Sequence, residues 1–554
     1  MVDLAGNDIT ARITNAGDLW WDGNDGRYTV KPPVDTLGDR PIQAHFTAAL
    51  WMAGRDPGGN IKAAAPVYGR NRGDFDYLPG PLNEDGVGED CLDWDLIFTI
   101  SREEINRALD LPSAGGIDTA LIPDNVLYWP GTGNPYFNDR YGVPLPEHDM
   151  APFVDHDGDG RYDPAKGDLP DFCGDQAVWT VFNDATLHRD SGTPNNVQAE
   201  VHLLAYSFNT PQDSVINRTT YYDYKIRNGG AEDLLGFHVG HFIDADVGCP
   251  TGDGVGSLPE HNAFYAYSVN GVDPPVCVAD IPGFGNTAPV TVYQVIPGYV
   301  SSICEAEDSP REDCYPEPAL HAFNTYLLGG LCDPPARFTL PNGAGEIYNV
   351  MQGKYIDGSP VYRSFRGTRD SFATITRYAY DGGLTADGEP WLQCTGTRSC
   401  ESPTSYSTSP FDLRPNDVVS YTLAVTTVFN VDHTTNGGCP DTVPIIRAAE
   451  RARKQIECCV IAPGGTTSIS PAADLDLAVF PNPATDAVTF KLRGAGTLRK
   501  VELFSIAGRY LGVMEAPGRT IRLDLRARGL PAGVYVYRAR TVAGGVVTGR
   551  LVVR

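Results

Sequence analysis

Glycine and proline recur along the whole chain and limit the length of any helix that it can form. The 554 residues include 60 glycines and 44 prolines, together close to a fifth of the sequence. Proline breaks a helix interior and glycine weakens one, so long helices and coiled coils are disfavoured. Such a chain favours short strands joined by turns. We expect a mainly β protein of several antiparallel β-sandwich domains with a few short helices.

The hydrophobic periodicity of several segments supports this expectation. Residues 221–226 alternate between inward and outward side chains, which is typical of a half-buried strand, and residues 199–207 and 418–429 show the same period. Residues 101–109 open with a Ser-Arg-Glu-Glu capping box, which predicts a short helix. A second helix is expected over residues 444–457, where a proline fits the first turn.

The sign of the charge reverses near the C-terminus. Residues 475–554 carry 13 basic and 5 acidic residues, whereas residues 1–474 carry 30 basic and 65 acidic residues. Such a reversal marks a domain boundary, and residues 462–474 have the Gly-, Ser-, Thr- and Pro-rich composition of a linker. Within the acidic part we expect a loop-rich aromatic region at 1–145 and a larger β-sandwich region at 146–461.

The overall composition also excludes classes of partner. The formal net charge is -27, and a surface of this sign repels a phosphate backbone, so nucleic acid is not an expected partner. Since no apolar run reaches about 18 residues, no membrane-spanning helix is expected.

Twelve cysteines all precede the predicted linker. None forms a pair with two residues between, so zinc-ribbon and thioredoxin-like sites are not predicted. An even number at scattered spacing suits disulfides in an oxidising compartment. Cys394 with Cys400 and Cys304 with Cys314 would close short loops. The alternative is that the thiols are reduced and buried in the cores.

Residues 475–554 contain short alternating segments separated by turns. The segments are Val488–Leu492, Val501–Ser505, Ile521–Leu525 and Val534–Ala539. About 80 residues with strands at this spacing predict a small antiparallel β-sandwich.

Four motifs lie in order along the same region. They are Phe480–Asp486 (FPNPATD), Leu503–Gly508 (LFSIAG), Leu530–Tyr535 (LPAGVY) and the terminal Leu551–Arg554 (LVVR). Together they resemble the type A sorting domain of the type IX secretion system, although the usual end is richer in lysine. The resemblance implies an Ig-like fold, a Bacteroidota-type host, Sec export, and passage across the outer membrane by the type IX machinery. It also implies an extracellular or outer-membrane surface location, frequent cleavage of the domain, and attachment to surface lipopolysaccharide.

The rest of the chain resembles a group of uncharacterised secreted Bacteroidota proteins that carry this sorting domain. The matching segments are Gly17–Gly23, Ala151–Asp155, Gly174–Trp179 and Phe182–Asp184. This resemblance implies a location and a fold but no chemistry. The first ten residues lack the basic start and apolar middle of a signal peptide, so we expect the sequence to begin at the mature end.

Residues 155–163 (DHDGDGRYD) are the sharpest candidate site. Carboxylates at alternate positions on a glycine turn converge on one point, and hard oxygen donors at this spacing suit calcium. The segment resembles the start of an EF-hand loop, but Lys166 stands where a bidentate glutamate is expected. The expected ligands are therefore Asp155, Asp157, Asp159, the carbonyl of Arg161, Asp163 and Asp168. The alternative is a solvated acidic turn.

Asp244, Asp246 and Asp253 form a second acidic group after a predicted strand. Calcium is one interpretation, and solvation at a sheet edge is the preferred one. His238 and His241 precede this group, but residues three apart on a strand point to opposite faces. We therefore expect ordinary strand histidines rather than a zinc site.

The sequence shows no Gly-x-Ser-x-Gly elbow and no phosphate-binding loop. The leading hypothesis is a secreted cell-surface structural or adhesive protein, stabilised by calcium and disulfides and able to assemble as a homo-oligomer. This hypothesis favours a protein without enzymatic activity. One alternative is an extracellular polysaccharide-active enzyme with paired carboxylates. Another is a carbohydrate-binding protein whose aromatic side chains stack on an extracellular glycan.

Overall fold

Residues 1–460 form one unit, here called the body, and residues 461–554 form a second. The structure is a computed structural model. It describes the chain apart from residues 34–39, 69–75, 84–85, 112–115, 189–190, 192–195, 278–280, 301–317, 329–335, 365–372, 396–400, 435–436, 458–475, 482–483, 494–496, 506–509, 526–532, 542–545 and 554. The expected linker, 462–474, lies outside the described residues.

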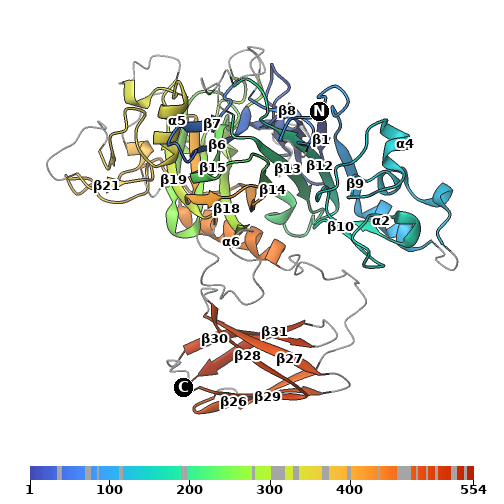
Figure 1. Cartoon of the computed structure of the whole chain (residues 1–554). Helices are drawn as coiled ribbons and strands as arrows, with labels where there is room; N and C mark the ends of the chain where they lie inside the picture. Colours follow the sequence, from blue (N-terminus) through green and yellow to red (C-terminus); the bar gives the residue numbers. More distant parts are fainter. Residues whose placement is uncertain are drawn as a thin grey trace. The chain divides into compact units, whose positions relative to one another are not determined.

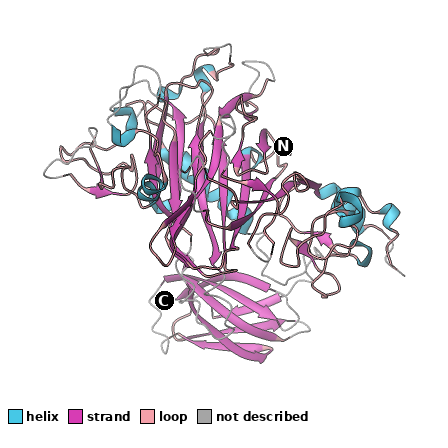
Figure 2. Cartoon of the chain, turned by 45° about the horizontal axis from the view of Figure 1, so that its top comes forward, coloured by secondary structure: helices cyan, strands magenta, loops and turns pink. Residues whose placement is uncertain are grey.

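Two large antiparallel sheets make up the body (Figures 1 and 2). The eleven-stranded sheet contains β1 (Val2–Leu4), β2 (Ile9–Ile13), β3 (Asp18–Leu19), β4 (Tyr28–Val30), β5 (Ile42–His45), β6 (Thr47–Arg55), β7 (Ile61–Ala64), β15 (Leu234–Asp244), β19 (Leu320–Thr325), β22 (Thr404–Thr408) and β23 (Phe411–Leu413). The nine-stranded sheet contains β8 (Leu78–Pro79), β9 (Phe98–Ser101), β12 (Gln176–Asn183), β13 (Ala199–Ser207), β14 (Thr219–Asn228), β16 (Asp253–Leu258), β17 (Ala263–Ser268), β18 (Val290–Val300) and β24 (Val418–Val428).

Short elements accompany the sheets. The α-helices are α2 (Arg102–Leu109), α3 (Asp124–Leu127), α4 (Phe137–Tyr141), α5 (Ala344–Met351) and α6 (Thr442–Glu457), and two small hairpins pair β10 (Phe153–Val154) with β11 (Leu169–Pro170) and β20 (Val361–Tyr362) with β21 (Ile375–Thr376). Strands fill the centre of the body, with helices around them (Figure 2). The expected mainly β, antiparallel fold is confirmed.

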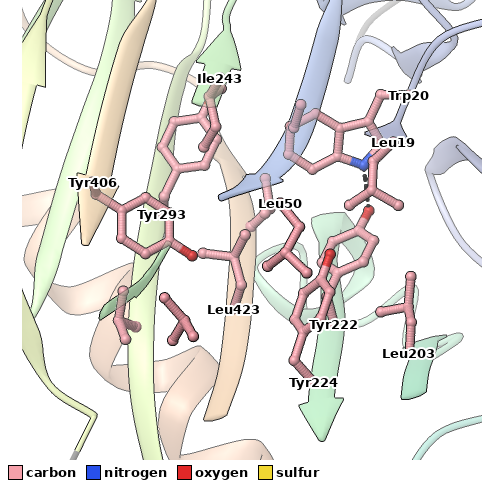
Figure 3. Close-up of a cluster of buried hydrophobic side chains, with 14 of the residues drawn as sticks. Leu19, Trp20, Leu50, Leu203, Tyr222, Tyr224, Ile243, Tyr293, Tyr406 and Leu423 are labelled. Atoms are coloured by element: carbon pink, nitrogen blue, oxygen red, sulfur yellow. Dashed lines mark hydrogen bonds between the residues drawn. The ribbon is translucent and has the colours of Figure 1, made fainter. Parts of the chain in front are cut away.

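Side chains from both sheets meet in one large core. Trp20 and Leu50 come from the first sheet and its turns, and Tyr222, Tyr224 and Leu423 come from the second (Figure 3). Burying one such side chain contributes roughly 1.5–3 kcal/mol. The indole N–H of Trp20 donates to the hydroxyl of Tyr222 at 2.8 Å, so the polar atoms of both rings are paired inside the core.

Local sequence patterns predict several elements correctly. The helix α2 begins after Ser101, whose hydroxyl accepts from the Glu104 amide while the Glu104 carboxylate accepts from the Ser101 backbone. The expected second helix is α6, which begins two residues earlier than predicted. The expected strands over residues 199–207 and 418–429 are β13 and β24.

The body does not divide near residue 145, where the sequence suggested a boundary. Strand β6 from the first expected region pairs with β15 from the second, between Thr47–Arg55 and Leu235–Asp244. Strand β9 likewise pairs with β12. Because both sheets draw strands from both sides of residue 145, residues 1–460 form a single unit.

Two disulfides lie within the described residues. Cys249 bonds Cys277, and Cys394 bonds Cys439 with their Cα atoms 5.4 Å apart. The expected Cys394–Cys400 pair is therefore wrong, because the fold brings Cys439, 45 residues away, beside Cys394. The expected Cys304–Cys314 pair lies outside the described residues, as does Cys400.

The C-terminal unit is a small sandwich of two antiparallel sheets. One contains β25 (Asp476–Phe480), β26 (Ala487–Arg493) and β29 (Thr520–Asp524), and the other contains β27 (Leu498–Ser505), β28 (Tyr510–Gly518), β30 (Gly533–Thr541) and β31 (Val546–Val553). Alternate residues of β26 are buried, and the Phe490 ring lies 5.1 Å from the Tyr537 ring of the facing sheet. The predicted sandwich is confirmed.

Candidate functional site

The Asp-rich loop connects β10 to β11. One carboxylate oxygen from each of Asp155, Asp157 and Asp159 lies within 4.8 Å of the others. The turn needs glycine, because Gly158 and Gly160 adopt left-handed φ values of 75° and 77°. The structure thus brings together three of the expected ligands.

Lys166 supplies the nearest positive charge to these carboxylates. Its Nζ lies 3.1 Å from Asp157 Oδ2 and 2.7 Å from Asp159 Oδ2. The hydrogen bond from Lys166 lowers the pKa of Asp159, so this carboxylate stays ionised. Asp155 instead holds the backbone of the turn, and its two oxygens accept from the amides of Gly158 and Gly160 at 2.7 and 2.8 Å.

The remaining expected ligands lie at the ends of the loop. Asp168 is fully buried, and its two oxygens accept from the His156 and Asp163 amides, both at 2.7 Å. Burial raises the pKa of Asp168. Asp163 accepts from the Ala165 amide at 3.1 Å, and the Arg161 guanidinium lies 3.5 Å from Glu147. Asp163 and Asp168 thus accept from backbone amides of the loop, and their calcium ligation, like that of the Arg161 carbonyl, stays a prediction.

The second acidic group is buried, so its expected solvation at a sheet edge is wrong. Asp244, Asp246 and Asp253 are at most 8% exposed. Asp244 accepts from the Tyr68 hydroxyl at 2.8 Å, and Asp246 accepts from the Gln43 amide at 3.0 Å. Burial raises the pKa of Asp244 to about 6 and raises the pKa of Asp246 well above its usual range.

Replacing Asp244 by asparagine is expected to stabilise the body at neutral pH and to leave it unchanged near pH 4. The native pKa of Asp244 exceeds its unfolded value, so the native state binds more protons between about pH 4 and 6. Protonated Asp244 therefore contributes to the stability of the native state at low pH, and this contribution is lost as the pH rises through about 6. A rise of about two pKa units corresponds to up to about 3 kcal/mol.

Urea unfolding of wild type and Asp244→Asn at pH 4.5 and 7.5 measures this effect. Asp139→Asn is the control, because Asp139 is exposed on α4. A stability difference between wild type and Asp244→Asn that is equal at both pH values would contradict the raised pKa.

The two strand histidines face different neighbours. Nδ1 of His241 lies 2.7 Å from the Tyr406 hydroxyl, whereas Nδ1 of His238 lies 2.8 Å from the Thr408 carbonyl oxygen. Burial lowers the pKa of His241 to about 3 and that of His238 to about 4. Both rings are therefore neutral parts of the packed sheet at neutral pH.

A third group was not predicted. Nε2 of His148 and Nε2 of His202 each lie 2.8 Å from Oε1 of Glu200, which is fully buried. Glu200 and His202 are two residues apart on β13, so both side chains lie on the same face of the strand. His148 stands 52 residues earlier, in a loop without periodicity, and no sequence signal connects it to the strand.

The tryptophans do not form a sugar-stacking surface. All seven are buried, at 4% exposure or less. Trp51 stacks on Phe242 and Trp94 stacks on Phe137, so the indoles fill cores between elements. A carbohydrate-binding surface on this chain would need other residues.

Comparison with known families identifies the C-terminal unit. Residues 478–554 match the family described as the secretion system C-terminal sorting domain. The chain carries a type IX secretion sorting domain. This sorting domain directs the chain to the cell surface or the extracellular space and interacts with the type IX machinery. Among the described residues, no helix combines the length and hydropathy needed to cross a membrane.

Solved structures resemble this chain only weakly. A polysaccharide lyase matches with 9% identity and a TM-score of 0.19, over 64% of this chain and 34% of the lyase. PorZ of Porphyromonas gingivalis, a surface component of the type IX system, matches with 11% identity and a TM-score of 0.13, over 71% of this chain and 48% of PorZ. Dimeric latent PorU of the same organism matches with 12% identity and a TM-score of 0.12, over 68% and 31%.

The chain spans less than half the length of each of the three structures. No curated protein matches the sequence.

Proposed function

We propose that this chain is a structural or adhesive protein of the cell surface, delivered by its type IX sorting domain and stabilised outside the cell by calcium and disulfides. The observation that carries the proposal is the convergence of Asp155, Asp157 and Asp159 on one glycine turn. Calcium takes six to eight oxygen ligands in a flexible geometry. Three carboxylates, backbone carbonyls and water together provide such a set.

Lys166 competes with calcium for the carboxylates of the loop. Its ammonium offsets one of the two negative charges of Asp157 and Asp159, so an entering ion must displace it. The Lys166 side chain is about half exposed, and its ammonium can move into water at small cost. Asp168 fixes the two ends of the loop through backbone amides, which keeps the loop in place during the exchange.

Calcium is expected to raise the melting temperature of the full chain, and a chelator is expected to reverse the rise. An ion that binds only the native state stabilises it by about 2.7 kcal/mol at a hundredfold excess over its dissociation constant. Thermal unfolding followed by circular dichroism measures the shift. Asp157→Ala should abolish it, whereas Lys166→Ala should lower the calcium concentration that is needed.

Asp139→Ala is the matched control, because it removes one exposed carboxylate from another part of the surface. An unchanged melting temperature in wild type would contradict calcium stabilisation. A shift that survives in Asp157→Ala would place calcium elsewhere.

The second candidate is an extracellular polysaccharide-active enzyme or carbohydrate-binding protein. One observation favours it: buried Glu200 orients the imidazole of His148, which is 28% exposed, and a carboxylate beside an imidazole is a general-base arrangement. Release of new reducing ends from extracellular polysaccharides by wild type, lost in His148→Ala, would replace the structural proposal.

A further inference from the structure

Glu200 and His202 lie on the face of β13 that points away from the core shared by the two sheets. Their neighbours Val201 and Leu203 point into that core, and side chains alternate along a strand. The loop that precedes β10 covers this outer face and contributes His148. Asp149 of the same loop pairs with Lys225 of β14 at 3.3 Å, which gives the loop a second attachment.

The two oxygens of Glu200 have different kinds of partner. Oε2 accepts from the backbone amide of Leu82 at 2.6 Å and from Arg227 Nη2 at 3.1 Å. Among the described residues, Oε1 is within hydrogen-bond distance of the Nε2 atoms of His148 and His202 only, each at 2.8 Å. Ligating carboxylates in metal sites are commonly held in this way, with outer donors on one oxygen and the ion on the other.

Hydrogen bonds alone do not satisfy this group. Nε2 of His148 lies 3.4 Å from Arg227 Nη2 as well as beside Glu200. A guanidinium only donates and a carboxylate only accepts. If Nε2 of His148 carries a proton, it meets a second donor at Arg227. If Nε2 carries a lone pair instead, it meets a second acceptor at Glu200. Nδ1 of His202 is also buried without a hydrogen-bond partner among the described residues. A cation between Nε2 and Oε1 would replace the proton that joins the imidazole to the carboxylate.

We propose that His148, Glu200 and His202 bind a zinc-class divalent ion. Two imidazoles and one carboxylate are typical zinc ligands, whereas calcium prefers oxygen alone. In a tetrahedral site with ligand bonds of about 2.0–2.1 Å, ligand atoms stand about 3.3 Å apart. The observed separations of 2.8 Å would have to widen to that value on binding, through rotation of the side chains. Three protein ligands leave a fourth position for water or a substrate.

The charge of Arg227 sets the strength of the site. Arg227 and Glu200 neutralise one another, so an entering ion gains no net negative charge from this pair. The ion therefore relies on the two imidazole nitrogens, and we expect micromolar rather than nanomolar affinity. Among common divalent ions this favours zinc, nickel and copper over magnesium and calcium.

Cobalt titration of the tag-free, metal-depleted full chain tests the site, with calcium in excess so that the Asp-rich loop does not compete. One equivalent of cobalt should give the visible absorption of a four-coordinate ion, and zinc should displace it. His148→Ala and Glu200→Gln should each weaken binding at least tenfold. His261→Ala is the matched control, because His261 lies on a separate short helix, η4 (Pro259–His261).

Two results of the binding experiment would overturn the proposal. One is the absence of zinc or cobalt binding below millimolar concentration. The other is binding that His148→Ala leaves unchanged while the variant keeps the wild-type circular dichroism spectrum. X-ray absorption of zinc-loaded wild type gives an answer independent of the variants. Two imidazole ligands are expected, and any other number overturns the assignment. Because calcium is saturating throughout, the result does not depend on the proposed calcium site.

Discussion

Replacing Trp20 by alanine is expected to lower the free energy of unfolding of the body by about 4–5 kcal/mol. Trp20 is fully buried, and its ring lies 5.1 Å from Tyr28 and 4.9 Å from His45. Truncation removes these contacts, opens a cavity and leaves the Tyr222 hydroxyl without its indole donor. The residue stands where the two sheets meet (Figure 3), so neighbours from both sheets lose packing.

Urea unfolding monitored by circular dichroism measures this cost. Trp20→Phe keeps most of the apolar volume and loses the N–H donor, so it should cost clearly less than Trp20→Ala. Leu92→Ala is the surface control, because Leu92 is 84% exposed. A Trp20→Ala variant as stable as Leu92→Ala would contradict the position of Trp20 in the core.

Replacing both Cys394 and Cys439 by alanine is expected to destabilise the body by about 4 kcal/mol. The bond closes a loop across 45 residues, and chain-entropy arguments give this magnitude for a loop of that length. The bond joins η11 (Gln393–Thr395) to the segment before α6, so its loss frees the chain ahead of that helix.

The double variant Cys249→Ala with Cys277→Ala provides the comparison. Its loop spans 28 residues, so the expected loss is slightly smaller, about 3.5 kcal/mol. Non-reducing peptide mapping by mass spectrometry checks the pairing directly. A peptide that joins Cys394 to Cys400 would contradict the observed bond.

The sequence predicts those parts of the fold that depend on near neighbours. The capping box at Ser101 and Glu104 predicts a helix because both hydrogen bonds form within four residues. Alternation in residues 221–226 predicts a strand and its buried face. The pairing of β6 with β15 depends on segments nearly 190 residues apart, so no local pattern reveals it. The expected boundary near residue 145 fails for that reason.

The same distinction separates the candidate sites. The group within residues 155–163 can be predicted from the local sequence, because its carboxylates converge within a single turn. The burial of Asp244 depends on Tyr68 and other residues that pack over the strand end. These residues are distant in sequence, so the sequence around Asp244 does not predict its burial. The group at Glu200 requires a strand and a distant loop, and only half of it follows the strand period.

The interleaved pairing of the body governs the order in which it can fold. A chain emerges with its N-terminus first. The apolar strand β6 acquires its β15 partner only after residue 244 is available, and β14 acquires β24 only after residue 428. Long-range pairing of this kind slows folding. The early strands therefore have unpaired edges until their partners emerge. The two sheets of the body can be completed only when almost all of its residues are available, shortly before the sorting domain emerges.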